Sequence, residues 1–146
     1  MIGVPRNPDF ESAIRDSFGR QAHMSTLGVS IERIAPGECD LRLPYSPAFC
    51  QQNGYMHAGA IASVADSANG YAAYSLAPPG TDVLAVEFKI NLLEPARADG
   101  FLARARVLRP GRTLSICQTD VVGTDVDARL IATMTSTIII RRLRRP

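Results

Sequence analysis

The sequence predicts an α+β fold in which an antiparallel sheet wraps around one long central helix. Residues 57–76 are rich in alanine and glycine and carry no turn signal before Pro78-Pro79-Gly80. They should therefore form a helix that is apolar nearly all round and buried. Six other segments alternate apolar and polar residues and are joined by short turns, which is typical of antiparallel strands. Curling such a sheet around the helix is the simplest way to bury it.

The remaining elements follow in order along the chain. Residues 9–25 predict a first helix, because Phe10, Ile14 and Phe18 recur at helical spacing. The turn signal Pro36-Gly37 separates two alternating segments and predicts a β-hairpin. The six strands are expected at residues 27–35, 38–44, 82–93, 100–108, 112–122 and 129–140. The edges of this sheet invite pairing with a second copy of the chain, so a dimer is expected.

Length, charge and cysteine usage narrow the function classes. The 146 residues suit a single domain spanning 1–146, with an N-terminal helical segment at 1–26 and a basic tail at 141–146. A formal net charge of +2 is too small to indicate a nucleic-acid-binding surface. No stretch approaches the roughly 20 apolar residues of a membrane span. The three cysteines lack any Cys/His pairing, which predicts reduced thiols in a cytoplasmic protein and no metal site.

Asp66 is the residue that most needs an explanation. It falls near the middle of the helix that is predicted to be buried, and no basic residue lies three or four positions away. An unpaired carboxylate is costly to bury. Asp66 either lies on a narrow solvated stripe with Ser63, Ser67 and Asn69, or it is a carboxylate retained for chemistry.

His57 lies just before the same helix. It is either a cap, a packing group or a participant in catalysis. Nine residues separate it from Asp66, which places the two on opposite helix faces and about 13 Å apart along the axis. A site that uses both would therefore need a second subunit. The unpaired N–H groups at a helix start can stabilise an oxyanion, and a carboxylate facing them can attack a carbonyl or activate water. This arrangement favours acyl transfer to water.

Two segments resemble the hotdog-fold thioesterases, in particular the PaaI-like and 4-hydroxybenzoyl-CoA thioesterase group. The first is Gln51-Gln52-Asn53-Gly54-Tyr55-Met56-His57-Ala58-Gly59-Ala60, followed by Val64-Ala65-Asp66-Ser67-Ala68. It is similar to the family's G-x-x-H-G-G motif with a helical Asp or Glu nine residues after the His. The second segment, residues 86–96, resembles the strand that follows the central helix. The resemblance covers about residues 27–140 and implies the hotdog fold.

The resemblance also implies a role for each matching position. Asp66 falls on the catalytic carboxylate, which acts as nucleophile or general base. Gln51 falls where the family orients the thioester or the water, His57 on the motif His, and Ala58 where a backbone N–H binds the thioester oxygen. The implied substrate is an acyl-CoA, bound without a cofactor across the interface of a homodimer or of a dimer of dimers. The further candidates for substrate or CoA binding are Gly59, Asn69, Ala85, Arg109 and Arg112.

The chain departs from the family pattern at three positions. Ala58 replaces the first Gly of the pair, which adds a methyl group near the substrate. Ala85 and Gly70 stand where relatives hold the water with Ser or Thr, so Asn69 or Ser67 would have to replace them. Guanidinium groups suit phosphate, which makes Arg109, Arg112 and the terminal arginines candidates for the CoA phosphates, although each is otherwise an ordinary surface charge.

Three functions remain open at this level. The first is hydrolysis of acyl-CoA thioesters with short, medium or aryl acyl groups. The second is a non-catalytic hotdog module that binds acyl-CoA. The third, a hotdog enoyl-CoA hydratase, ranks last, because that group resembles a motif with Asp and His five residues apart on one helix, whereas nine residues separate them here.

Overall fold

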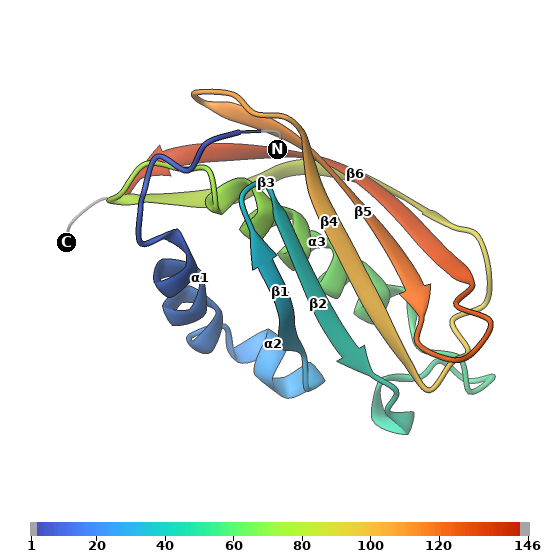
Figure 1. Cartoon of the computed structure of the whole chain (residues 1–146). Helices are drawn as coiled ribbons and strands as arrows, with labels where there is room; N and C mark the ends of the chain where they lie inside the picture. The colour runs from blue at the N-terminus through green and yellow to red at the C-terminus, as the bar shows by residue number, and fades with distance from the viewer. Residues whose placement is uncertain (1–2, 144–146) are drawn as a thin grey trace.

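The computed structural model, which describes residues 3–143, shows a six-stranded antiparallel sheet curved around one long helix (Figure 1). The strands are hydrogen-bonded in the order β1-β2-β4-β5-β6-β3. The elements are α1 (Phe10–Gly19), α2 (Ala22–Leu27), β1 (Ser30–Ala35), β2 (Glu38–Pro44), the short helix η1 (Pro47–Phe49), α3 (Ala58–Tyr74), β3 (Thr81–Leu92), β4 (Gly100–Arg109), β5 (Leu114–Gly123) and β6 (Leu130–Arg142). The predicted α+β hotdog arrangement is confirmed.

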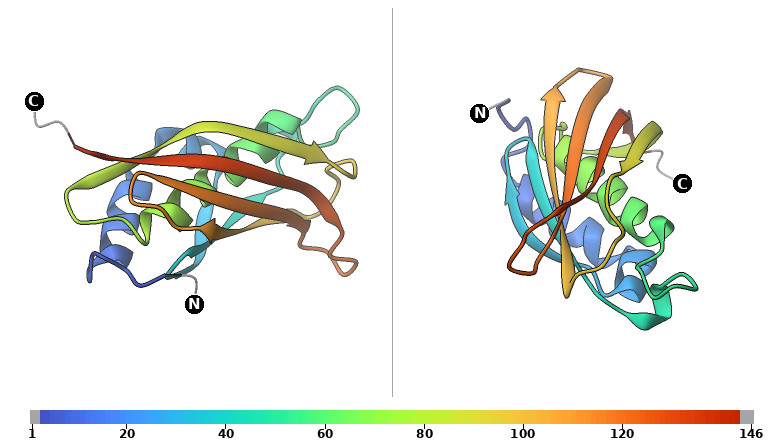
Figure 2. Two further views of the ribbon diagram at one scale, coloured as in Figure 1. Left: turned by 90° about the horizontal axis from the view of Figure 1, so that it is seen from above. Right: turned by 90° about the vertical axis from the view of Figure 1, so that its right-hand side faces the viewer.

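Helix α3 lies on the concave side of the sheet and contacts five of the strands, β2 to β6 (Figure 2). Small side chains such as Ala65, Ala68 and Ala72 are fully buried and allow the sheet to approach the helix closely. Larger side chains from the strands, including Phe101 and Ile138, fill the remaining space. Because each such side chain contributes about 1.5–3 kcal/mol on burial, the helix and the sheet stabilise one another.

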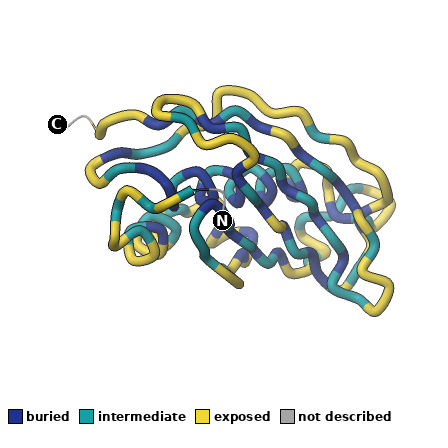
Figure 3. Tube along the Cα trace, turned by 45° about the horizontal axis from the view of Figure 1, so that its top comes forward, coloured by how far each residue is buried: buried dark blue, intermediate teal, exposed yellow. Residues whose placement is uncertain are grey.

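The strands show the alternation that the sequence predicts. In β5 and β6 buried residues alternate with half-exposed ones (Figure 3). The buried apolar residues belong to the core cluster that also contains the alanines of α3. Five of the six strands begin and end within two residues of the expected positions. The first strand is the exception, since it starts at Ser30, whereas Leu27 ends α2 and Gly28 is its C-cap.

The single helix expected over residues 9–25 is wrong, because the chain forms two helices there. Helix α1 ends at Gly19, a residue with low helix propensity, and Gln21 adopts an extended conformation before α2 begins. Ile14 and Met24 are buried, so each short helix still anchors an apolar residue in the core. Both helices pack against α3 on the side that the sheet leaves uncovered (Figure 2). The break directs the side chain of Gln21 towards α3.

Strand β3 is a long edge strand with apolar side chains exposed on it. The exposed fractions are 47% for Leu84, 56% for Val86 and 46% for Phe88. Its only ladder partner is β6, so one edge has no strand beside it within residues 3–143. Such an edge is available for pairing with another chain.

Two expectations concern the surface of the molecule. In the described part of the chain, no helix combines the length and the apolar character needed to cross a membrane. Arg141 and Arg142 of the predicted basic tail are the last two residues of β6, whereas Arg144 and Arg145 lie outside the described residues.

Candidate active site

The start of α3 is held by His57. This residue has an extended backbone, and its Nδ1 atom accepts a hydrogen bond from the N–H of Gly59 over 2.8 Å. The N–H groups of Ala60 and Ile61 donate to the carbonyl oxygen of His57. The N–H of Ala58 has no hydrogen-bond partner among residues 3–143. One donor at the positive end of the helix dipole is therefore free to bind an oxygen atom of a ligand.

The loop before α3 is fixed by backbone hydrogen bonds. Gln51 donates its N–H to the carbonyl of Tyr55 over 2.8 Å, and the N–H of His57 donates to the carbonyl of Phe49 over 2.8 Å. Gly54 has a φ of 82°, a conformation that glycine adopts readily and other residues rarely do. The side-chain oxygen of Gln51 accepts a hydrogen bond from the N–H of Asn53. These contacts place the side chain of Gln51 next to the start of the helix.

Gln51 and Ala58 line one cavity of about 370 Å³, which we call the Ala58 cavity. Its other walls come from the loop, from α3 and from the segment at the end of β3, including Leu92 and Leu93. The thioester-orienting residue and the oxyanion donor implied by the resemblance therefore face the same space.

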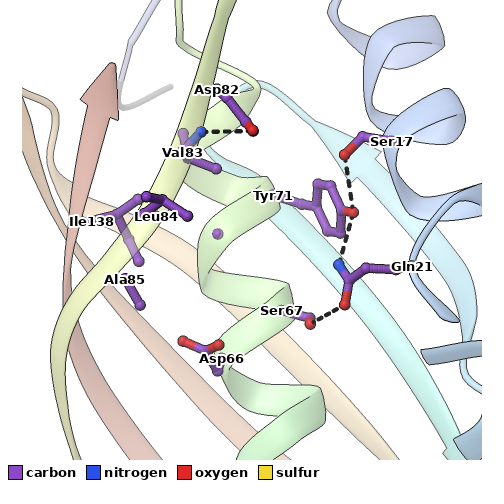
Figure 4. A pocket seen from close by; sticks show the side chains of 11 residues that line it. Ser17, Gln21, Asp66, Ser67, Tyr71, Asp82, Val83, Leu84, Ala85 and Ile138 are labelled. Atoms are coloured by element: carbon purple, nitrogen blue, oxygen red, sulfur yellow. Dashed lines mark hydrogen bonds between the residues drawn. The ribbon is translucent and has the colours of Figure 1, made fainter. Parts of the chain in front are cut away.

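Asp66 lies in a different cavity, of about 300 Å³, which we call the Asp66 cavity (Figure 4). It is lined by Ser17, Gln21, Asp66, Ser67, Gly70, Tyr71, Asp82, Val83, Leu84, Ala85 and Ile138. Ala85 and Ile138 are cross-strand neighbours of β3 and β6 that form the wall facing the carboxylate. Ala85 and Gly70 line the same cavity as Asp66, and neither supplies a hydroxyl group.

The environment of the Asp66 carboxylate is poor in partners. Its Oδ1 atom is buried and has no hydrogen-bond partner within residues 3–143. Burial raises the pKa of Asp66 above its ordinary value of 3.8. A carboxylate without a hydrogen-bond donor retains its basicity, so it is suited to abstract a proton from water or to attack a carbonyl carbon.

A group of hydrogen-bonded polar side chains lines the Asp66 cavity between α3 and the N-terminal helices, and no local sequence pattern indicates these contacts directly. Gln21 donates from Nε2 to the hydroxyl of Tyr71 over 2.9 Å and accepts from the hydroxyl of Ser67 over 3.2 Å. The hydroxyl of Ser17 lies 3.3 Å from that of Tyr71. The available signal was the spacing of Ser63, Ser67 and Tyr71, which stand four residues apart on one face of α3.

Asn69 does not lie with this group. Its side chain is fully buried against β5, where its Oδ1 atom accepts a hydrogen bond from Thr119 over 2.7 Å. The hydroxyl of Thr119 also lies 3.1 Å from the carbonyl of Ala65. Asn69 is absent from the lining of the Asp66 cavity, so its contacts are those of a residue that ties α3 to the sheet.

The residues singled out in the sequence thus fall into separate groups within one chain. Asp66 and Ala85 share one cavity, Gln51 and Ala58 share another, and His57 and Gly59 line a third cavity of about 460 Å³. Arg109 and Arg112 are exposed at the β4–β5 turn, near the C-terminal end of α3 rather than its start.

The cysteines lack the properties of catalytic nucleophiles. Burial raises the pKa of Cys39 and of Cys117 to about 12, so both thiols stay protonated at neutral pH. Cys50 donates its thiol hydrogen to the carbonyl of Ser46 over 3.3 Å. Among the described residues, Asp66 is therefore the stronger candidate for the reacting group.

The sequence and the structure are similar to those of known proteins. A model of the thioesterase superfamily matches residues 53–127. A Halobacterium salinarum protein, whose name marks it as an inferred esterase, is 35% identical over 104 residues, which are 68% of this chain and 68% of that protein.

Solved structures match over most of the chain. A thioesterase family protein from Silicibacter pomeroyi has a TM-score of 0.89 and 44% sequence identity, covering 92% of this chain and 99% of that one. The PaaI protein of the phenylacetic acid degradation operon of E. coli has a TM-score of 0.83 and 19% identity, covering 95% of this chain and 96% of its own. At 19% identity, the likeness to the PaaI protein concerns the fold alone.

Proposed function

Because this chain belongs to the thioesterase superfamily, we propose that it hydrolyses acyl-CoA thioesters with short, medium or aryl acyl groups to the free acid and CoA. The family match extends from the loop before the central helix to the β5–β6 turn, so it includes both the helix start and Asp66. The resemblance drawn from the motif is thereby confirmed at the level of the family.

The observation that carries the proposal is the state of Asp66. Its Oδ1 atom is buried, lacks a partner among the described residues and faces a cavity large enough for a small acyl group. In the proposed reaction, Asp66 either removes a proton from the attacking water or itself attacks the thioester carbon. As a general base, Asp66 passes the proton of the water to the CoA sulfur when the C–S bond breaks. As a nucleophile, it forms a mixed anhydride as the C–S bond breaks and CoA leaves, and water then hydrolyses the anhydride. Both routes consume one water and yield the free acid and CoA.

The N–H of Ala58 is the proposed oxyanion donor. It is the backbone donor at the start of α3 that His57 leaves free, whereas the N–H of Gly59 is engaged by the imidazole. A donor at the positive end of a helix stabilises the negative charge that develops on the thioester oxygen. Gln51, which lines the same cavity, is proposed to orient the thioester or the water.

We propose that the complete site forms between two copies of the chain. The Ala58 cavity and the Asp66 cavity are separate in one copy, and they border opposite ends of β3. Antiparallel pairing of β3 with β3 of a partner would cover Leu84, Val86 and Phe88 and bring the start of β3 in one copy to the end of β3 in the other. Asp66 of one copy would then face the oxyanion donor of its partner.

The CoA phosphates are proposed to bind guanidinium groups at the surface. Arg109 and Arg112 are exposed at the same end of the sheet as Arg141 and Arg142, since β5 begins and β6 ends there. Four guanidinium groups in one region attract a polyphosphate and can bind it by paired hydrogen bonds. A cytoplasmic location is proposed with this activity, and the three free cysteines support it.

A non-catalytic acyl-CoA-binding module is the second candidate. Ala85 and Gly70 favour it, because they line the Asp66 cavity where relatives carry a hydroxyl that holds the water. In this alternative the cavity would bind the acyl group without hydrolysis. Asp66→Asn would then leave the rate of CoA release unchanged at its uncatalysed level.

The decisive experiment is thiol release from acetyl-, hexanoyl-, benzoyl-, phenylacetyl- and palmitoyl-CoA by the wild type, Asp66→Asn and Asp127→Asn. Asp127 is exposed in the β5–β6 turn, so its variant carries the same chemical change away from the cavity. Turnover by the wild type and by Asp127→Asn, lost by at least about 100-fold in Asp66→Asn, supports the proposal. Equal rates for all three proteins at the uncatalysed level would favour the binding module.

A further inference from the structure

We propose that Ser136 and Asn69 together bind a buried water molecule that donates a hydrogen bond to the carboxylate of Asp66, and that Ser136 is thereby a positioning residue for the reaction. The water site follows from polar atoms in the core that lack partners. Its effect on the rate rests on the proposed thioesterase function.

Three buried side-chain atoms of α3 and β6 have no hydrogen-bond partner within residues 3–143. They are Oδ1 of Asp66, Nδ2 of Asn69 and Oγ of Ser136. The side chains of Asn69 and Ser136 are fully buried, with exposed fractions of 0%. Leaving such groups unpaired is unfavourable, and folded proteins pair nearly all of them with protein atoms or with ordered water.

The order of the strands places Ser136 between the other two residues. Asn69 faces β5, since its Oδ1 atom accepts a hydrogen bond from Thr119 over 2.7 Å. Asp66 faces β3 and β6, because residues of these strands line its cavity. Strand β6 lies between β5 and β3, and Ser136 belongs to the set of its residues that is buried. The hydroxyl of Ser136 therefore lies under α3, between the faces that carry Asn69 and Asp66.

The spacing along the elements suits a bridge of one water molecule. Asp66 and Asn69 are three residues apart on α3, which is about 4.5 Å along the axis and about 60° around it. Ser136 is the cross-strand neighbour of Cys117, so it is diagonal on the sheet to Thr119, which bonds Asn69. Two hydrogen bonds through one water join atoms roughly 5–6 Å apart. A single water can thus contact all three unpartnered atoms.

The three atoms also have the hydrogen-bonding character that one water needs. Nδ2 of Asn69 and the hydroxyl of Ser136 are donors, whereas the ionised carboxylate of Asp66 only accepts. A water that accepts from both donors and donates to Oδ1 makes three hydrogen bonds, the usual number for a buried water. Because both of its lone pairs are used, this water orients the carboxylate and is not the nucleophile.

This water should favour the ionised form of Asp66. Burial is the cause that raises the pKa of Asp66, and a hydrogen bond donated to the carboxylate acts in the opposite direction. The other titratable side chains near it are Asp82 and Tyr71 of the cavity lining and Cys117 across from Ser136. No Lys, Arg or His is among the lining residues of the cavity. The water is therefore the proposed source of support for the charge.

Ser136→Ala removes one of the two donors, and Ser115→Ala is its matched control. Ser115 is a buried serine of β5 whose hydroxyl accepts from the N–H of Gly111. In Ser136→Ala we expect kcat to fall about tenfold at unchanged KM, with the acidic limb of the pH profile moved to higher pH. Ser115→Ala should keep the pH profile of the wild type even if its Tm falls. The same profile in all three proteins would overturn the role of Ser136.

Two measurements test the water site without any activity. A crystal structure at about 1.5 Å should show one water roughly 2.6–3.2 Å from Nδ2 of Asn69, Oγ of Ser136 and Oδ1 of Asp66. The pKa of Asp66, followed by NMR of its carboxyl carbon, should be higher in Ser136→Ala than in the wild type. If no acyl-CoA is hydrolysed, the proposed function fails, and these two results still decide the water site. Direct bonds among the three side chains, or no water at Oδ1, would contradict the proposal.

Discussion

The Nδ1 atom of His57 accepts the backbone N–H of Gly59 over 2.8 Å, and this one contact defines which donor remains at the start of α3. An Nδ1 atom that accepts this hydrogen bond has its lone pair engaged by the helix start. The N–H of Ala58 is left without a partner within residues 3–143. His57 thus acts on the proposed oxyanion donor through the helix start that it caps.

Replacing His57 should affect stability and rate through the cap. His57→Ala leaves the N–H of Gly59 unpaired and should lower the free energy of unfolding by about 1 kcal/mol. Loss of the helix start should also reduce kcat. His57→Asn supplies a side-chain oxygen that caps helices well and should recover most of both losses. Thermal unfolding and kcat for the best substrate of the panel measure the two effects.

The matched control for this prediction is His23→Ala. His23 is exposed and contacts the hydroxyl of Ser63 through Nε2, and it makes no hydrogen bond to the N–H groups at the start of α3. Its variant should unfold and turn over much as the wild type does. If His57→Asn and His57→Ala were equally slow while both remained folded, the imidazole would take part in the chemistry directly.

Asp66 should make the protein less stable at neutral pH than in acid. Burial raises the pKa of its carboxyl in the folded state, so the folded protein binds the proton more tightly than the unfolded chain. The stabilisation is complete below the ordinary value of 3.8 and is lost as pH rises through the folded pKa. Asp66→Asn removes this loss and should raise Tm at pH 7 by about 1–3 °C, allowing for partial exposure.

The same group should shape the pH dependence of the rate. Since the ionised carboxylate is the reactive form, kcat/KM should fall as pH decreases through the raised pKa of Asp66, at a pH above 3.8. The difference in Tm between the wild type and Asp66→Asn should disappear near pH 3.8. A Tm difference that stays constant from pH 3.5 to 8 would show that ionisation of Asp66 is not its cause.

Much of the fold could be predicted from the sequence because its signals are local. The strands alternate with period two, and the alanines of residues 57–76 indicate a buried helix. Turn residues such as Pro36-Gly37 mark where the strands end. Asp66 stood out for a similar reason, since an acidic residue among alanines is visible without any knowledge of distant contacts.

The features that were not predicted depend on contacts between distant segments. The break between α1 and α2 is stabilised by the bonds of Gln21 to Tyr71 and Ser67, which lie far along the chain. The burial of Asn69 likewise depends on Thr119 of β5. The spacing of Asp66 and His57 did indicate that one chain separates the parts of the site, because helix geometry alone determines that relationship.

Thr119→Val tests whether Asn69 is a structural residue. The substitution conserves shape but removes the hydroxyl, so it leaves the buried Oδ1 atom of Asn69 without a donor. We expect the free energy of unfolding to fall by about 1–3 kcal/mol with KM unchanged. Thr135→Val, at an exposed position of β6, should change stability little. A raised KM in Thr119→Val, at unchanged stability, would instead support a role for Asn69 in substrate binding.

The proposed phosphate contacts can be tested by comparing an acyl-CoA with a shorter substrate that lacks the nucleotide. The double variant Arg109→Gln and Arg112→Gln should raise KM for an acyl-CoA about threefold to tenfold, because charge-assisted contacts to phosphate are lost. KM for the corresponding acyl-pantetheine, which lacks the nucleotide, should stay the same. Arg15→Gln removes an exposed arginine from α1 and should affect neither substrate. Equal increases for both substrates would argue against a phosphate contact.

The exposed edge of β3 is the proposed contact between two copies of the chain. Val86 is 56% exposed on a strand that pairs only with β6 in the described residues, and we expect a partner's β3 to cover it. Val86→Lys places a charge where the two edges would meet, which opposes strand pairing. The variant should become monomeric by light scattering and lose at least about 100-fold in kcat/KM, since each copy holds only part of the proposed site. Val126→Lys, at a turn residue that is 98% exposed, should leave both assembly and rate unchanged. An active Val86→Lys monomer would show that one chain completes the site by itself.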